Sequence, residues 1–127
     1  MSPKAKKIIG WILAGLLTLV ATGSALGKFT ADPSTEMGQQ FIKSGLFDIR
    51  FILGGIELLC AVLLIIPRTS TIGLVMFVGY WGGAIATHLS HGESATAPLV
   101  LLVITGVIAI VRNPELLSRV LGKEVPA

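Results

Sequence analysis

The chain has 127 residues, of which 53% are hydrophobic and only 13% charged, and its mean hydropathy is +0.84. Soluble domains carry about 25% charged residues, so this composition indicates a membrane protein. Four membrane-spanning helices with short connections would use the 127 residues and leave no room among them for a soluble domain. The net charge of +3 comes from basic residues at the ends of apolar segments, which argues against nucleic acid as a partner. The single cysteine, Cys60, excludes an intrachain disulfide and a cysteine metal cluster.

Four apolar segments approach the length of about 20 residues that a membrane-spanning helix needs. They cover residues 8–26, 47–66, 71–89 and 95–111. Pro67 ends the second segment, because proline cannot continue the hydrogen-bond ladder of a helix. Asn113 and Pro114 open an amphipathic tail, 114–122, that we expect on the membrane surface. The sequence therefore predicts an all-α fold, an integral membrane four-helix bundle that forms a single domain over residues 1–127.

Basic residues predict how this bundle is oriented. Those before the first segment, between the second and third, and after the fourth are Lys4, Lys6, Lys7, Arg68, Arg112, Arg119 and Lys123. The opposite side has only Lys28 and Lys43, both in the first predicted loop. Because Lys and Arg are retained in the cytoplasm, we expect both termini to be cytoplasmic. Residues 35–44 of the outer loop, with Phe41, predict a short interfacial helix.

Glu57 lies in the middle of the apolar run 51–66. A carboxylate at the bilayer centre costs a few kcal/mol or more, so it must face protein or water, have a partner, or be neutral. At 1.5 Å per residue from the cytoplasmic end of each segment, Glu57, Tyr80 and Thr18 all lie about 14–15 Å deep. We predict Tyr80 as the first-choice and Thr18 as the second-choice partner. Glu57 is then either a neutral structural carboxyl group or a group that contacts a ligand or handles protons.

A second polar layer lies about 21–27 Å deep by the same count. It includes Asp48, Arg50 and His88. We expect Asp48 or Arg50 to meet His88 across the second and third segments, in the wall of a pocket that opens outward. His88 and His91 share a helical face, but without a thiolate or a third histidine we predict no metal site.

Glycines at spacings of four predict close helix packing. The pairs are Gly23 with Gly27 and Gly79 with Gly83, and Gly54 lies on the same helical face as Arg50 and Glu57. Packing within the chain is the preferred interpretation of the pairs, and dimerisation is the alternative.

Several segments carry a family resemblance. Residues 54–59 read GGIELL and precede an apolar run that ends at Pro67, residues 84–89 read AIATHL, and residues 28–30 read KFT. In this order and spacing they resemble the DoxX-like membrane proteins, over about residues 8–112. The resemblance implies a four-helix protein of the bacterial inner membrane and an emphasis on Glu57, His88 and Arg50. Relatives have been described as a subunit of thiosulfate:quinone oxidoreductase, as part of a membrane complex for oxidative-stress resistance, and as eukaryotic chaperones or cargo receptors.

Three functions stay open. In the first, a pocket with Glu57, Tyr80 and His88 binds a quinone, an isoprenoid or a lipid. In the second, the bundle is an accessory subunit of a membrane complex or a homo-oligomer in the lipid bilayer. In the third, it is a subunit of a quinone-linked membrane oxidoreductase in which Glu57 and His88 relay protons. We expect no intrinsic cofactor beyond a bound quinone or lipid and no enzymatic activity of the chain alone, and we favour the first two functions in combination.

Overall fold

The computed structural model describes residues 1–124, and this part of the chain is helical without strands. Its elements in chain order are α1 (Pro3–Thr30), α2 (Glu36–Ser44), the 3-10 turn η1 (Phe47–Ile49), α3 (Arg50–Ile65), α4 (Ser70–Ser90), α5 (Thr96–Arg112) and α6 (Pro114–Val120). The predicted all-α class is confirmed.

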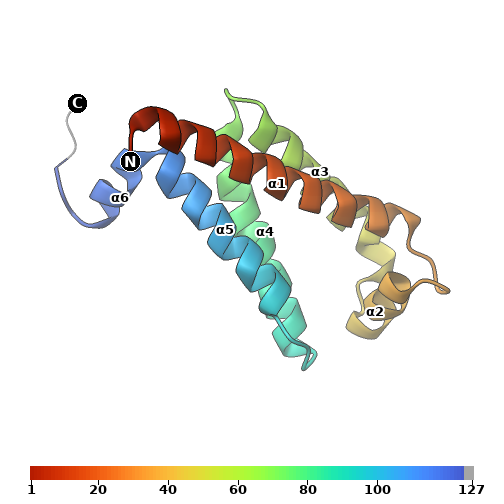
Figure 1. Cartoon of the computed structure of the whole chain (residues 1–127). Coiled ribbons are helices and arrows are strands. Elements are labelled where there is room, and N and C mark those ends of the chain that lie inside the picture. Colours follow the sequence, from red (N-terminus) through yellow and green to blue (C-terminus); the bar gives the residue numbers. More distant parts are fainter. Residues whose placement is uncertain (125–127) are drawn as a thin grey trace.

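The four longest helices form two antiparallel pairs (Figure 1). One pair is α1 with α3 and the other is α4 with α5, and each helix of one pair also contacts a helix of the other. Figure 1 shows the pairs close together near the N-terminus and diverging toward the ends where α2 and the α4–α5 loop lie. The bundle is therefore closed at one end and open at the other.

The core lies where the two pairs meet. Its buried members are Ala14, Leu17, Ala21, Cys60, Ala61, Leu64, Leu74, Phe77, Trp81 and Ile108. Small side chains on α1 let the neighbouring helices approach closely. The buried Phe77 and Trp81 rings stack in this core with their centroids 5.3 Å apart. This packing holds the closed end together and fixes the start of the open end.

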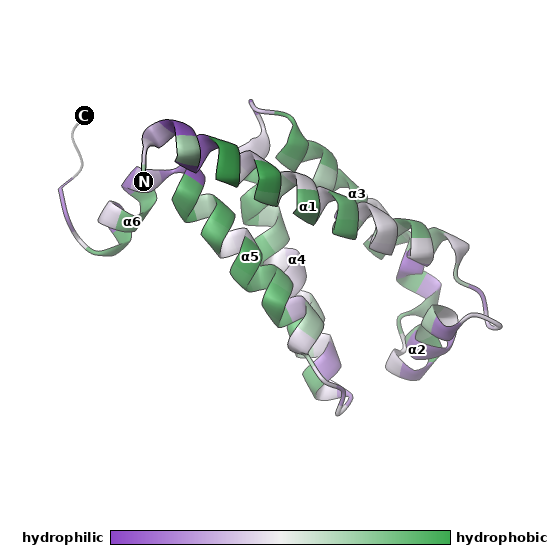
Figure 2. Ribbon diagram, viewed as in Figure 1, coloured by the Kyte–Doolittle hydropathy of each residue, from purple (hydrophilic) through white to green (hydrophobic). Residues whose placement is uncertain are grey.

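Large apolar side chains are also exposed on the four long helices, and Figure 2 shows that hydrophobic residues recur along each of them. Leu19 and Val75, for example, are 71% and 67% exposed. A soluble monomer rarely exposes a continuous apolar surface of this extent. The helices α1 and α4 are each long and apolar enough to cross a membrane. Helix α5 is long enough only when it is counted together with α6, as one span bent by 105°. The chain is a membrane protein.

Side chains at the helix ends explain where the elements begin. The Ser2 hydroxyl accepts a hydrogen bond from the Ala5 amide at 3.1 Å, and the Thr35 hydroxyl accepts one from the Gly38 amide at 3.0 Å. Each satisfies an amide that a helix start leaves without a partner. At the α3–α4 turn the hydroxyl of Ser70 instead donates back to the Leu64 carbonyl at 2.7 Å, which ties the start of α4 to the end of α3.

Two of the helices differ in extent from the predicted segments. Segment 8–26 is a longer helix, Pro3–Thr30, because Lys28 remains helical and points into the protein. Segment 47–66 divides into η1 and the 16-residue α3. At 1.5 Å per residue α3 is about 24 Å long, less than the hydrocarbon core of about 30 Å. The segments 71–89 and 95–111 agree with α4 and α5 to within one residue at each end, and the tail 114–122 contains α6.

The predicted packing glycines fall into two groups. A Cβ on Gly54 would lie 3.2 Å from the Lys28 Cβ, and one on Gly27 would lie 2.9 Å from the Met37 Cε, so both are packing positions. Within residues 1–124, no atom lies within 4 Å of a Cβ built on Gly23, Gly79 or Gly83, so these three make no close helix contact here. The α3–α4 crossing instead uses Gly73, which the sequence did not single out.

Candidate functional site

Glu57 is completely buried on the face of α3 that also carries Gly54, Cys60 and Leu64. This confirms the expectation that its carboxyl group is turned toward neighbouring helices. Its Oε1 accepts a hydrogen bond from the Nζ atom of Lys28 at 2.8 Å. Its Oε2 is also buried but has no hydrogen-bond partner among residues 1–124. One half of the carboxylate is therefore bound within the protein and the other half is not.

Lys28 reaches Glu57 from the last turn of α1. Only 9% of its side chain is exposed, and its Nζ atom donates a second hydrogen bond to the Ser24 hydroxyl at 2.7 Å, one helical turn earlier. Gly54 on α3 lets the stem of Lys28 pass close to the backbone, and the Nζ lies 6.0 Å from the ring centre of Tyr80. A buried ammonium needs this kind of compensation, because burying a lone charge costs several kcal/mol.

The predicted partners of Glu57 were wrong. Neither the Tyr80 phenol nor the Thr18 hydroxyl forms a hydrogen bond with it, and Thr18 Oγ1 is buried without a partner in the described part of the chain. The Tyr80 ring instead lies beside the Lys28 ammonium and packs edge-on against the Trp81 ring, with the two ring centroids 5.1 Å apart. Sequence reasoning missed Lys28, which was assigned to a loop. The spacing of four between Ser24 and Lys28 is the signal that could have placed it on the helix.

The ion pair lies in the wall of a cleft of about 580 Å³ between the diverging helix pairs. Side chains from five helices line it, and most of the lining is apolar. Its polar members are Ser24, Lys28, Gln40, Glu57, Tyr80, Trp81, Thr87 and His88. The indole Nε1 of Trp81 is buried and has no acceptor within residues 1–124. The wall of the cleft thus combines an apolar surface with two unpaired polar atoms, one from α3 and one from α4, that are buried in residues of its lining.

The predicted outer layer does not assemble. Arg50 turns toward η1 and the end of α1, where its guanidinium donates to the carbonyls of Phe47 at 2.8 Å and Ala31 at 3.1 Å. The Nδ1 atom of His88 lies 3.1 Å from the Ser94 carbonyl oxygen and 3.6 Å from a Glu93 carboxylate oxygen. Asp48 is exposed. The expected meeting of Asp48 or Arg50 with His88 was wrong, because α3 and α4 have already diverged at this level.

The remaining titratable groups do not suggest a metal centre. No group of three or more His, Cys, Asp or Glu side chains in residues 1–124 is arranged to hold a metal ion. Outside the long helices, the pKa of Asp32 in the α1–α2 turn is lowered by two hydrogen bonds from Ser34. The bond from the Ser34 hydroxyl has the larger effect and the bond from its amide the smaller. This carboxylate is exposed and shapes the turn that carries α2 to the rim of the cleft.

Comparison with known proteins gives one match. The sequence profile described as the DoxX-like family matches residues 12–111, which include Lys28, Glu57, Tyr80 and His88. No curated protein and no solved structure matches the chain. The matched region extends from the third turn of α1 almost to the end of α5 and covers most of the chain. The protein belongs to the DoxX-like family.

Proposed function

We propose that the cleft binds an uncharged lipophilic molecule with a polar head, and that a quinone fits it best. The observation that carries the proposal is the buried Lys28–Glu57 pair with one free carboxylate oxygen, set in a mostly apolar cleft. Ligand pockets have about this volume, 300–1,000 Å³, and combine an apolar lining with a few polar groups. An isoprenoid alcohol or a lipid carries related chemistry.

The pair supports this ligand class through its charges. Lys28 and Glu57 neutralise each other, so the site has no excess charge to attract an anion or a cation. A quinone carbonyl would accept a hydrogen bond from Lys28, and a quinol hydroxyl would donate one to Glu57 Oε2. The apolar lining from α3, α4 and α5 would hold the ring and tail.

The proposal includes a topology. The helices α1, α3, α4 and α5 would form a four-helix bundle in the bacterial inner membrane, with both termini in the cytoplasm and α2 at the opposite surface. Lys4, Lys7, Arg68 and Arg112 at the closed end support this orientation, because Lys and Arg favour the cytoplasmic side. The open end of the cleft would then face the outer leaflet.

Two other functions are less well supported. A proton relay from Glu57 to His88 would need intermediate groups, because no hydrogen bond joins the two side chains within the described residues. An accessory role in a larger complex is compatible with the exposed glycines of α4. The relay could use the free oxygen of Glu57 but has no such path to His88, and the accessory role does not use that oxygen.

Quenching of Trp81 fluorescence by ubiquinone-1 tests the proposal. The Trp11→Phe variant leaves Trp81, which lines the cleft, as the only tryptophan in the chain. In this background we expect saturable quenching. Glu57→Gln should weaken the affinity for ubiquinone-1 about tenfold, the effect of losing one hydrogen bond to a charged group.

Glu36→Gln, on the exposed side of α2, removes the same charge outside the cleft and should leave the affinity unchanged. Quenching that rises linearly with quinone and is equal in all variants would show partition into lipid and refute the proposal. Native mass spectrometry of the gently extracted protein should also show a co-purifying lipophile, and that species should be lost in Glu57→Gln.

A further inference from the structure

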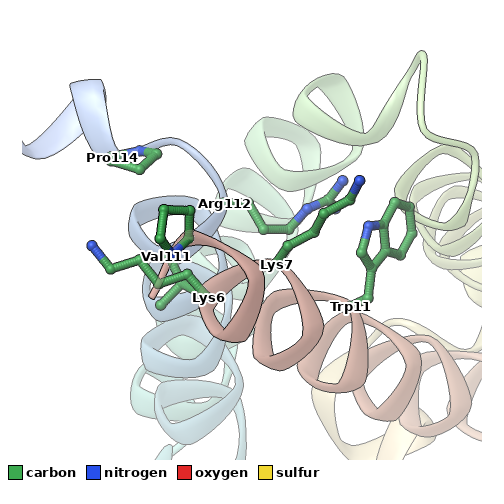
Figure 3. Close-up of a pocket in the computed structure, with 7 residues that line it drawn as sticks. Lys6, Lys7, Trp11, Val111, Arg112 and Pro114 are labelled. Atoms are coloured by element: carbon green, nitrogen blue, oxygen red, sulfur yellow. The ribbon is translucent and has the colours of Figure 1, made fainter. Parts of the chain in front are cut away.

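A second cavity, of about 390 Å³, lies at the closed end of the bundle (Figure 3). It is formed where the start of α1 meets the junction of α5 and α6. The side chains that Figure 3 labels around it are Lys6, Lys7, Trp11, Val111, Arg112 and Pro114. It is separate from the cleft, with which it shares no lining residue.

Arg112 is held in place across this cavity. Its stem crosses α1 at Gly10, where an added Cβ would lie 2.5 Å from the Arg112 Cγ. Its guanidinium carbon lies 4.1 Å from the centre of the Trp11 ring, and the guanidinium donates to the buried Ser70 hydroxyl. A cation fixed on three sides is prepared for a ligand, because little side-chain freedom remains to be lost on binding.

The positive charges of this cavity are not balanced within the protein. Figure 3 shows that Lys7 and Arg112 extend in the same direction, toward Trp11, while Lys6 lies on the other side of the cavity. Across residues 1–124, none of these three cations forms an ion pair with a carboxylate. Like charges that converge repel each other, and an anion between them removes that repulsion. Arg and Lys together are the usual receptors of phosphate groups.

The surroundings indicate that the anion comes from a lipid. The cavity lies at one end of α1 and at the end of α5, two of the apolar helices. Trp11, in its wall, is a residue type that favours the level of the lipid headgroups. Between α5 and α6 the chain turns by 105°, and the apolar side chains of α6, such as Leu117 and Val120, are exposed. This arrangement fits a helix that lies along a membrane surface beside the cavity.

We propose that this cavity binds the phosphate group of an anionic phospholipid such as phosphatidylglycerol. Arg112 and Lys7 contact the phosphate oxygens, and Lys6, whose amine points the other way in Figure 3, adds positive charge on the other side of the cavity. Trp11 lies beside the glycerol and the start of the acyl chains. The site is independent of the ligand in the cleft.

Quenching by brominated lipids tests the proposal in the Trp81→Phe background, where Trp11 is the only tryptophan. The probes are brominated phosphatidylglycerol and brominated phosphatidylcholine, each diluted into phosphatidylcholine vesicles. We expect phosphatidylglycerol to associate about tenfold more strongly than phosphatidylcholine, the effect of one or two charge-assisted hydrogen bonds. Lys6→Gln/Lys7→Gln should reduce this ratio to near 1.

The matched control is Lys4→Gln/Arg68→Gln, which removes the same charge but changes no residue of the cavity. It should keep most of the preference for phosphatidylglycerol. An equal loss in both double variants would show a general attraction to an anionic surface and overturn the proposal, as would the absence of a preference in the starting protein. Displacement of the brominated lipid by inorganic phosphate would show a site for soluble phosphate, and would also overturn it.

Discussion

Lys28 and Arg112 are two cations held among the helices at opposite ends of α1, and their surroundings have much in common. A serine hydroxyl accepts a hydrogen bond from each, Ser24 from Lys28 and Ser70 from Arg112. An aromatic ring lies beside each, with Tyr80 at 6.0 Å from the Lys28 Nζ and Trp11 at 4.1 Å from the Arg112 guanidinium carbon. They differ in that only Lys28 has a carboxylate partner.

This difference predicts what each site binds. Because a serine and a ring offset only part of the cost of removing a cation from water, a full countercharge is needed. Glu57 supplies it in the cleft, so an uncharged ligand can bind there without a further electrostatic cost. Arg112 is only partly buried and has no carboxylate partner in the described part of the chain, so water offsets part of its charge and an anionic ligand can offset the rest. On these two proposals, the bundle holds a neutral ligand at one end and an anion at the other.

The largest expected effect follows from separating the pair in the cleft. Lys28→Met keeps the length of the side chain but leaves the Glu57 carboxylate buried without a countercharge. We expect it to lower the free energy of unfolding by about 3–5 kcal/mol, the usual cost of breaking a buried ion pair. Reversible unfolding by sodium dodecyl sulfate, followed by circular dichroism, measures this change.

The double variant Lys28→Met/Glu57→Leu distinguishes charge from shape at the same positions. It removes both charges and should restore the free energy of unfolding to within about 1 kcal/mol of the starting protein, because apolar replacements of a buried pair are often neutral. It should also abolish the binding of ubiquinone-1. Equal destabilisation of the single and double variants would contradict the view that the pair is balanced by charge.

A smaller effect is expected when the other cation is displaced. Gly10→Ala places a methyl group where the Arg112 stem now lies, 2.5 Å from its Cγ. We expect a loss of about 1 kcal/mol, at the low end for an overpacked position because the arginine stem can move. The preference of Trp11 quenching for phosphatidylglycerol should fall severalfold, while binding of ubiquinone-1 at the cleft should stay the same.

Gly15→Ala is the control on the same helix. No atom of the described residues lies within 4 Å of a Cβ at Gly15, so the change should stabilise α1 by about 0.5–1 kcal/mol through backbone entropy alone. It should leave both binding readouts unchanged. A parallel loss of lipid preference in both variants would mean that Arg112 is not the residue through which Gly10 acts.

The comparison of the two cations also shows where sequence reasoning succeeded and where it failed. Hydropathy located the long helices, and the cost of a charge in lipid marked Glu57 correctly as a buried group. Its partner was missed for two reasons. A residue count gives the depth of a side chain on its own helix, but it gives neither the direction in which the side chain points nor the offset between helix ends.

The contact between Gly54 and Lys28 shows how large that offset is. The two helices are antiparallel, so a step forward from Gly54 along α3 corresponds to an equal step back from Lys28 along α1. Ile65, at the end of α3, therefore lies about level with Leu17 of α1. The beginning of α1 therefore extends well beyond α3, and depths counted from the two ends cannot be compared. For the same reason Lys28, which was placed outside the membrane, lies beside Glu57. Lys28 also has a long side chain, and no pattern of depth alone could show that it turns inward.

The smallest expected effect tests whether the ring or the hydroxyl of Tyr80 stabilises the Lys28–Glu57 ion pair. The phenol makes no hydrogen bond within residues 1–124, whereas its ring faces Lys28 at 6.0 Å. Tyr80→Phe keeps the ring, so the free energy of unfolding should change by less than about 0.5 kcal/mol, as for substitutions that remove no interaction. Tyr80→Leu removes the ring and should cost at least about 0.5–1 kcal/mol more, the contribution of one cation–π contact. Both variants are measured by the same unfolding experiment.

A loss of 2 kcal/mol or more in Tyr80→Phe would show that the hydroxyl is a partner of the carboxylate after all, and the cleft would then hold a hydrogen-bonded triad rather than a balanced pair.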